Sequence, residues 1–360
     1  APAIDNAGVV RSALESARRT RLGPGIFTSG AITKGRKGEE LAGIAGMKSA
    51  GCVMLTDDGY AVDNPQVLRR AMEYARDYDL PLSSHCELKA LSGKGCMHEG
   101  KISYALGLPG IPNISEEICI SRDIRLAEYT GVHLNIQHVT TIEGMRTIKR
   151  AKDRGIRVTC EITPHHLMFN HEHIGDYDTH YKMNPPLRTK ADNEALLEGL
   201  IDGTFDLIAT DHAPHTPFEK SQDFVSAPNG ITGLDTALVS LYHHFVATGK
   251  FGWDLVVKRY SAEPRRLMGL PAVSIEVGQP ADIILFDPDA ETTFTAEFMK
   301  SKSINTPFIN QTLKGSVDLV VLGTEWREYR ELDPATLGDL VADRHVIVAE
   351  VPQSPLGQAN

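Results

Sequence analysis

Short apolar runs alternate with helical patterns along most of this chain, and this alternation restricts it to few folds. Runs typical of strands cover 26–32, 52–57, 80–85, 132–138, 156–162 and 205–210. Apolar residues recur at helical spacing over 65–78, 115–129, 142–153, 190–201, 233–247 and 261–268. Strand–helix alternation produces parallel strands joined by right-handed crossovers. The sequence therefore predicts an α/β fold built on a parallel sheet or barrel.

The pattern changes after residue 270, where short strands separated by turns replace the alternation. We predict a barrel over 1–270, a small β module over 271–332 and a tail over 333–360. The Gly-rich segment 87–114 is a long connection, and connections longer than about 12–15 residues are more often functional than idle.

Composition excludes two classes of partner. The net charge is -10 and no stripe of Lys or Arg compensates it, so we expect no nucleic-acid partner. No run of about 18 apolar residues is present, so we expect no membrane partner. The five cysteines include no C-x-x-C pair, which favours a reducing compartment, and we expect a cytoplasmic protein.

Asp and His residues stand at the ends of five successive predicted strands. They are Asp58, His85, His138, the pair His165 and His166, and Asp211. In a barrel of parallel strands these carboxyl ends meet on one face, where such enzymes build their sites. A single residue of this kind is more often a cap, but five in series indicate a site.

Imidazole and carboxylate without a nearby thiolate suit Zn²⁺ and related divalent ions. Such an ion lowers the pKa of a bound water from about 15.7 toward about 7, and two ions about 3.5–4 Å apart can share a carboxylate. Asp211 is placed to carry a proton to a leaving nitrogen. We therefore predict hydrolysis of an amide-like bond. The "HEH" stretch at 171–173 also has ligand spacing, but its polar, turn-rich surroundings favour a surface role.

Many motifs along the chain point to one family. They are "GAITKGRKGEELA" (30–42), "AGCVMLTDDG" (50–59), "LPLSSHCE" (80–87), "LNIQHVTT" (134–141), "VTCEITPHHL" (158–167), "KMNPPLR" (182–188), "DGTFDLIATDHAPH" (202–215), "NGITGLDTAL" (229–238) and "VGQPADIILFDP" (277–288). In their order and spacing the chain resembles the bacterial class I dihydroorotases of the cyclic amidohydrolase superfamily, over nearly its whole length up to about residue 325. The resemblance implies a (β/α)8 TIM-type barrel, of which about six βα units are present here.

The resemblance also implies roles for single residues. Asp58 matches a carboxylate that bridges two metals, where hydantoinases and allantoinase use a carboxylated lysine. His85 and His138 match ligands of the more buried ion, and Asp211 matches a metal ligand that is also the catalytic acid and base. Asn184, His215, Asn229 and Gly230 match substrate-contacting positions, whereas His165 and His166 match no direct ligand and are interpreted as lining the site.

The implied reaction interconverts N-carbamoyl-L-aspartate and L-dihydroorotate in pyrimidine biosynthesis, with one or two Zn²⁺ per subunit. A homo-oligomer is implied, as is a possible association with aspartate carbamoyltransferase. Two alternatives remain open at this point. One is another cyclic amidohydrolase, a dihydropyrimidinase or allantoinase; the other is a non-catalytic dihydroorotase-like scaffold of aspartate carbamoyltransferase.

One departure from the family pattern concerns the start of the chain. In the family, the first barrel strand ends in an H-x-H motif followed by an Arg, and the second strand is followed by an Asn. The two His, the Arg and the Asn are not present in this sequence. We expect these two strands and two metal ligands to lie upstream of Ala1. A chain that truly began there would have an open barrel, and we expect it to fold poorly and to be nearly inactive.

Overall fold

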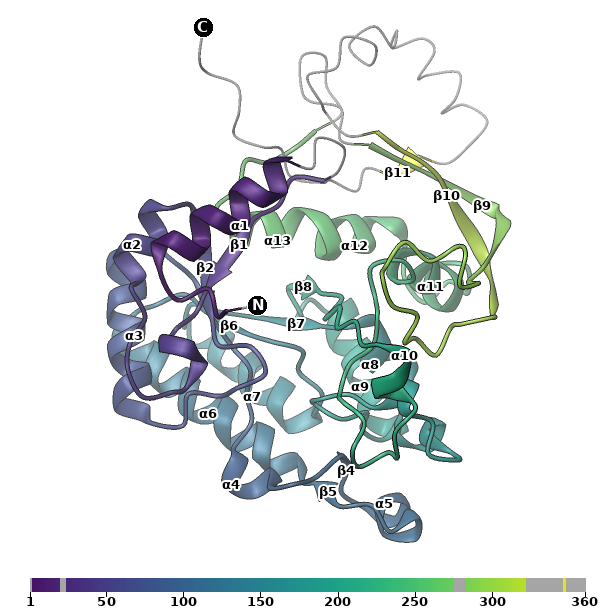
Figure 1. Cartoon of the computed structure of the whole chain (residues 1–360), viewed down its shortest axis with the longest axis horizontal. Helices are drawn as coiled ribbons and strands as arrows, with labels where there is room; N and C mark the ends of the chain where they lie inside the picture. The colour runs from purple at the N-terminus through teal and green to yellow at the C-terminus, as the bar shows by residue number, and fades with distance from the viewer. Residues whose placement is uncertain (1, 20–23, 275–282, 322–345, 348–360) are drawn as a thin grey trace, which may run out of the picture.

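A computed structural model of the chain describes residues 2–19, 24–274, 283–321 and 346–347. Its centre is a parallel sheet of six strands in the order β1-β2-β3-β6-β7-β8 (Figure 1). The strands are β1 (Thr28–Gly30), β2 (Cys52–Thr56), β3 (Leu82–Ser84), β6 (Leu134–Ile136), β7 (Val158–Ile162) and β8 (Leu207–Ile208). Each lies within one of the six predicted runs, so the predicted α/β sheet is confirmed.

Helices precede and follow the strands, and those between β1 and β7 lie along the outer side of the curled sheet (Figure 1). The helices are α1 (Ala7–Arg19), α2 (Ile44–Ser49), α3 (Pro65–Asp77), α6 (Asn113–Thr130), α7 (Ile142–Asp153), α8 (Pro164–Met168), α9 (Lys190–Ile201), α10 (Pro217–Lys220) and α11 (Ala237–Leu241). Single-turn 3₁₀ helices lie at η1 (Lys34–Arg36), η2 (His171–Ile174) and η3 (Thr179–Tyr181). Helix α3 illustrates why the predicted helices form. The Asn64 side chain caps it by accepting from the backbone N–H of Gln66 at 2.9 Å, and proline occupies its first position.

The predicted bounds of α7 and α9 are correct, whereas the later helices differ from prediction. Helix α11 continues into a π-helical turn, η4 (Tyr242–Val246). Further on, α12 (Trp253–Val257), a second π-helical turn η5 (Lys258–Ala262) and α13 (Glu263–Leu267) follow without a break. The prediction for this segment began only at 261, and the five residues of α12 include Trp and two Val residues, which are weak helix formers.

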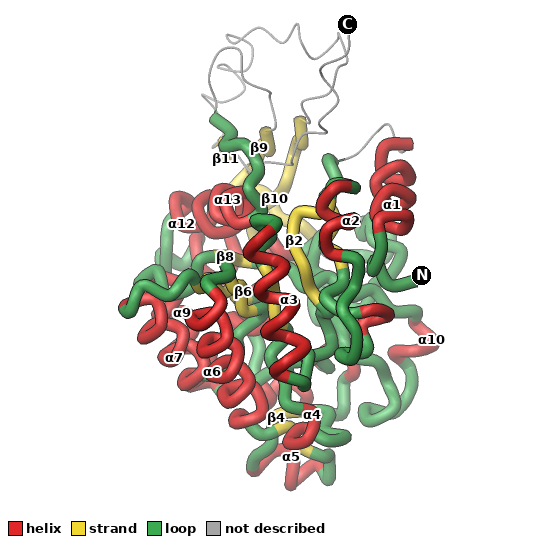
Figure 2. The backbone as a smooth tube through the Cα atoms, turned by 90° about the vertical axis from the view of Figure 1, so that its left-hand side faces the viewer, coloured by secondary structure: helices red, strands yellow, loops and turns green. Residues whose placement is uncertain are grey.

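The long segment 87–114 folds into a small unit of its own. It contains α4 (Lys89–Ser92), β4 (Met97–His98), α5 (Lys101–Leu106) and β5 (Gly110–Ile111), and β4 pairs with β5. Glycine is required at position 110, because a Cβ there would lie 2.6 Å from the Cα of Glu99. In Figure 2 this unit lies at the opposite end of the molecule from strands β9 and β10.

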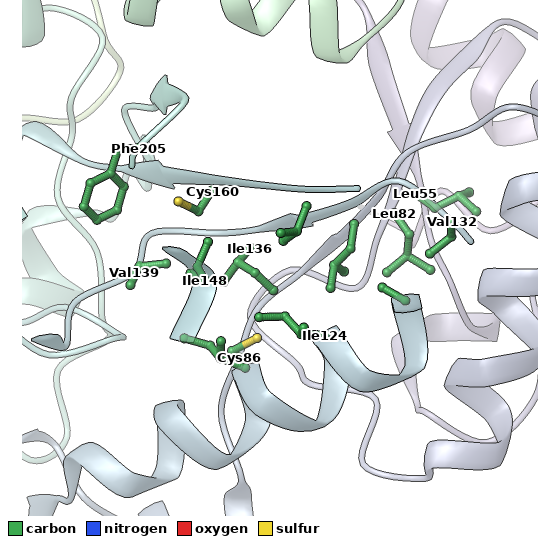
Figure 3. Packing of buried hydrophobic residues seen from close by; sticks show 14 of the residues in the cluster. Leu55, Leu82, Cys86, Ile124, Val132, Ile136, Val139, Ile148, Cys160 and Phe205 are labelled. Atoms are coloured by element: carbon green, nitrogen blue, oxygen red, sulfur yellow. The ribbon is translucent and has the colours of Figure 1, made fainter. Parts of the chain in front are cut away.

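The main core lies between the sheet and its helices. Figure 3 shows Leu82 and Ile136 of the sheet packed toward Ile124 of α6 and Ile148 of α7, with Phe205 at one end of the cluster. All of these side chains are buried. The strands are short, so the residues that follow each one emerge directly at the edge of this core.

A second sheet covers one end of the molecule. Strand β9 (Ile283–Thr293) pairs antiparallel with β10 (Thr312–Val321) and with β11 (Val346–Ile347). The buried Phe286 of β9 packs against Tyr242 and Trp253, which joins this sheet to the helices of the barrel. β9 and β10 lie within the predicted module 271–332 and β11 within the predicted tail. Residues 275–282, 322–345 and 348–360 lie outside the described part of the chain.

All five cysteines are buried and free. Within the described ranges, no helix is both long enough and apolar enough to cross a membrane.

Candidate metal centre and surrounding site

Three predicted metal ligands converge at the carboxyl ends of neighbouring strands. Asp58, His85 and His138 follow β2, β3 and β6, which are adjacent in the sheet. Nδ1 of His85 lies 3.0 Å from Nε2 of His138, and Oδ1 of Asp58 lies 3.7 and 3.6 Å from these two atoms. Parallel strands place their carboxyl ends at one edge, so this grouping follows from the strand order.

The electrostatics of the three residues are those of a site for a cation. Both imidazoles are buried. Burial opposes the charge of Asp58, but its contacts with His138 and His85 outweigh this effect and hold the pKa of Asp58 well below its usual value. Burial likewise opposes a charge on His138, but Asp58 and the negative charges of Asp211 and Glu161 raise the pKa of His138 to about 9. The carboxylates therefore attract positive charge to this point.

The donor set fits a bound metal ion. One ligand atom from each of the three residues lies within 4.8 Å of the others. Two nitrogens bound to zinc at about 2.0–2.1 Å lie roughly 3.3 Å apart in tetrahedral geometry, close to the spacing of the two histidines. His138 also has a backbone φ of 31°. A non-glycine residue in this region is strained and is held there by its surroundings.

A second group, Cys86, Cys119 and Asp123, also has ligand atoms close together. Asp123 already accepts from the Ser84 hydroxyl at 2.6 Å and from Nε of Arg122 at 2.7 Å. The Arg122 guanidinium therefore already supplies a positive charge beside Asp123.

Asp211 lies beside the three-residue group but is not part of it. It follows β8 with a φ of 46° and is half-buried. Burial and the charge of Asp58 raise the pKa of Asp211, while the charges of His138 and His85 lower it. The pKa of Asp211 is raised and that of Asp58 is lowered, so these two carboxyl groups are shifted in opposite directions.

Asn184 lies on the other side of His85. Its Nδ2 donates to Oε2 of Glu87 at 3.0 Å and lies 3.4 Å from Nε2 of His85. Glu87 is buried and also accepts from Lys89 Nζ at 2.6 Å. Sequence reasoning did not single out Glu87, although it stands two residues after His85 in the quoted "SSHCE". Its contact with Asn184 could not be predicted from the sequence, because the two residues are distant in the chain.

His215, Asn229 and Gly230 form a second cluster. Nε2 of His215 contacts the Asn229 carbonyl at 2.8 Å. Gly230 has a φ of 145°, and a Cβ there would lie 2.7 Å from the Cβ of Ala213, so only glycine fits. The buried Asn305 donates to the carbonyls of Ala213 and Gly230, both at 3.0 Å. Asn305 lies in the predicted β module, so its place beside the barrel loops was not foreseen.

The other histidines of the motifs have different surroundings. His166 is buried, and its Nε2 donates to the Pro185 carbonyl at 2.9 Å, next to Asn184. His212 accepts from the backbone N–H of Gly233 at 3.1 Å and thereby holds a loop. The surface role predicted for "HEH" is wrong for His171, which is buried and packs against His98.

Comparisons with known proteins place the chain in a family. The model of the Amidohydrolase family matches residues 3–327. A dihydroorotase of Syntrophotalea carbinolica is 47% identical over 290 residues, which cover 81% of this chain and 68% of that protein. A dihydroorotase of Desulforapulum autotrophicum is 45% identical over 321 residues, 89% of this chain and 75% of that protein. Among solved structures, the L-hydantoinase (dihydropyrimidinase) of Arthrobacter aurescens has a TM-score of 0.75 at 21% identity, covering 90% of this chain and 74% of that one.

Proposed function

The chain belongs to the amidohydrolase family, and we propose that it carries out the dihydroorotase reaction, the reversible conversion of L-dihydroorotate and water to N-carbamoyl-L-aspartate. Two relatives of this name are 45% and 47% identical to it over most of its length. The observation that carries the proposal is the convergence of Asp58, His85 and His138 at adjacent strand ends. An amidohydrolase centre needs its ligands at this edge of the sheet.

We infer that the resident ion is Zn²⁺, one or two per subunit, held by Asp58, His85 and His138 and joined by Asp211. Nitrogen and oxygen donors without thiolate support this choice. When bound, the metal polarises the amide carbonyl and makes water a better nucleophile at neutral pH.

The chain's own residues then have distinct tasks. In the ring-opening direction, Asp211 accepts a proton from the attacking water and delivers it to the ring nitrogen as the C–N bond breaks. In ring closure it takes that proton from the carbamoyl nitrogen. Its half-buried position and raised pKa support a residue that exchanges protons.

We infer that two groups of polar residues orient the substrate. Asn184 supplies an amide on the His85 side, and His215 with Asn229 and Gly230 supplies a second set of polar groups. Each set is held by contacts to other segments, which fixes its geometry before substrate arrives.

Substrate turnover tests the proposal directly. The zinc-loaded protein is assayed with dihydroorotate, hydantoin and allantoin at equal concentrations. We expect turnover of dihydroorotate, with the other two slower by orders of magnitude. Preference for hydantoin or allantoin would identify another cyclic amidohydrolase.

Metal analysis separates an enzyme from a non-catalytic scaffold. We expect the purified protein to retain about one or two zinc ions per chain and to lose turnover on chelation. A protein that retains no zinc and turns over none of the three substrates would favour the scaffold. Homo-oligomerisation and association with aspartate carbamoyltransferase stay predictions; light scattering of the protein alone and with that enzyme tests both.

A further inference from the structure

A buried carboxylate holds the turn that follows the metal-ligating His138. Glu116 of α6 is 3% exposed and accepts from the backbone N–H groups of Thr140 at 2.9 Å and Thr141 at 3.1 Å. It also accepts from the hydroxyls of both threonines. Four donors from one turn therefore point at a single side chain from a different element.

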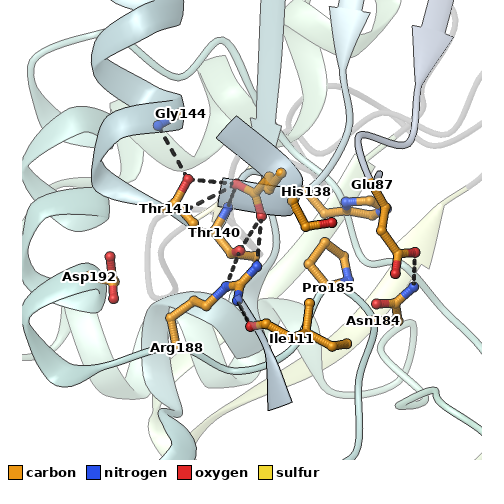
Figure 4. A network of polar contacts seen from close by, with 12 residues as sticks. Glu87, Ile111, His138, Thr140, Thr141, Gly144, Asn184, Pro185, Arg188 and Asp192 are labelled. Carbon is orange, nitrogen blue, oxygen red and sulfur yellow. Dashed lines mark hydrogen bonds and ion pairs between the residues drawn. The ribbon is translucent and has the colours of Figure 1, made fainter. Parts of the chain in front are cut away.

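Arg188 completes this network. Its Nη2 lies 3.5 Å from Glu116, its Nε donates to the Thr140 hydroxyl at 3.0 Å, and its Nη1 donates to the Ile111 carbonyl at 2.9 Å. Figure 4 shows Arg188 between Thr140 and Ile111, with His138 and the Asn184–Pro185 segment beside them. Glu116 and Arg188 are both buried, and other groups also form hydrogen bonds with their polar atoms. A buried ion pair is stable under this condition.

The network lies where the backbone is strained. His138 has a φ of 31°, and the turn held by Glu116 begins two residues later. A residue persists in such a conformation only when its surroundings over-determine it. The Thr141 hydroxyl that donates to Glu116 also caps α7, because it accepts from the Gly144 N–H at 3.2 Å.

We propose that Glu116 is a positioning residue of the metal centre: it fixes the turn that aims His138, and Arg188 holds its carboxylate in place. The proposal rests on the metal site of the proposed function. The buried polar partners that orient metal-ligating histidines typically contribute 10–100-fold to metal affinity. Glu116 acts on His138 through the backbone of the turn at Thr140 and Thr141, and not through the imidazole itself.

Zinc affinity, measured by competition with a chromophoric chelator, is the test, and it does not depend on turnover. Glu116→Gln keeps the shape but replaces one acceptor oxygen and removes the charge, and we expect it to weaken zinc binding 10–100-fold. Glu117→Gln is the matched control, since the Glu117 side chain makes no hydrogen bond within the described residues. It should bind zinc like the wild type.

A milder pair of variants covers the case in which Glu116→Gln does not fold. Thr140→Val removes the hydroxyl that joins Glu116 to Arg188, and Thr140→Ser keeps it. We expect Thr140→Val to weaken zinc binding and Thr140→Ser to restore it, with both variants folded by circular dichroism. Wild-type zinc affinity in both Glu116→Gln and Thr140→Val would overturn the proposal, whatever their thermal stability. If the wild-type protein bound no zinc, the proposed metal site would be wrong, and the proposed role of Glu116 would be wrong with it.

Discussion

At the scale of single residues, Asp58 and Asp211 differ in how closely they contact the two histidines of the site. Asp58 is drawn into contact with two histidines, whereas Asp211 lies beside them with its carboxylate outside the group of three. The two acidic residues therefore have different surroundings although both follow strands of the same sheet.

Replacing Asp211 tests its proposed role. Asp211→Asn keeps the size of the side chain but removes the proton acceptor, and we expect turnover of dihydroorotate to fall about 10²–10⁴-fold. Asp153→Asn, at the exposed end of α7, is the control and should leave turnover unchanged. Circular dichroism should show the same fold for all three proteins. Near-normal turnover in Asp211→Asn would assign the proton transfer to another group.

A second residue-scale prediction concerns acid stability. Burial, helped by the charge of Arg157, lowers the pKa of His133 from 6.5 to about 4. Between these values the unfolded chain binds the proton and the folded chain does not, so the free energy of unfolding decreases as pH falls from about 6.5 to about 4. His98 and His244, whose pKa values are also lowered to about 4, act in the same direction.

His133→Gln should make this loss of stability smaller. Urea unfolding at pH 7 and at pH 4.5 is compared for the variant and the wild type, both without metal. We expect a smaller decrease in the free energy of unfolding for His133→Gln. An equal decrease in both proteins would show that His133 does not contribute.

At the scale of elements, two buried lysines hold the loop that carries Asn229 and Gly230. Lys182 Nζ donates to the Val225 and Ala227 carbonyls at 2.9 and 2.5 Å. Lys220 Nζ donates to the Thr179 and Pro228 carbonyls at 2.8 and 3.0 Å. Within the described residues, the Val225, Ala227 and Pro228 carbonyls accept only from these two ammonium groups, which therefore order backbone that would otherwise have unsatisfied carbonyls.

Removing either ammonium should loosen this loop selectively. Lys182→Met leaves the Val225 and Ala227 carbonyls without a partner, and Lys220→Met leaves the Pro228 carbonyl without one, at a cost of about 1–3 kcal/mol per buried group. The Thr179 carbonyl still accepts from the backbone N–H of Lys182 at 3.1 Å. We expect hydrogen exchange over 224–230 to become at least about tenfold faster, while exchange in the six-stranded sheet stays unchanged. Lys190→Met, whose side chain is 75% exposed, is the control. Uniformly faster exchange would indicate global destabilisation and contradict a local clamp.

At the scale of the whole molecule, the antiparallel sheet and the barrel share one interface. Phe286 is 1% exposed and lies with its ring centroid 4.8 Å from Tyr242 and 5.0 Å from Trp253. Asn305, from the connection between β9 and β10, reaches the barrel loops at Ala213 and Gly230. The connection between β9 and β10 therefore also holds the barrel loops at Ala213 and Gly230.

Truncating Phe286 tests this connection. Phe286→Ala should lower the free energy of unfolding by about 3–5 kcal/mol, because it leaves a cavity in a packed aromatic cluster. Phe298→Ala, at a side chain that is 41% exposed, should cost much less. We expect a single transition in urea for all three proteins. A separate early transition in Phe286→Ala alone would show that the two sheets unfold independently.

The sequence by itself determined the strands, their parallel order and the gathering of Asp58, His85 and His138. These follow from local periodicity and from the rule that parallel strands place their carboxyl ends at one edge. Only the tertiary structure decided which groups support them. Glu116, Arg188, Glu87 and Asn305 act on residues that are distant in the chain. Their partners are set by how helices and loops pack, and periodicity carries no information about such packing.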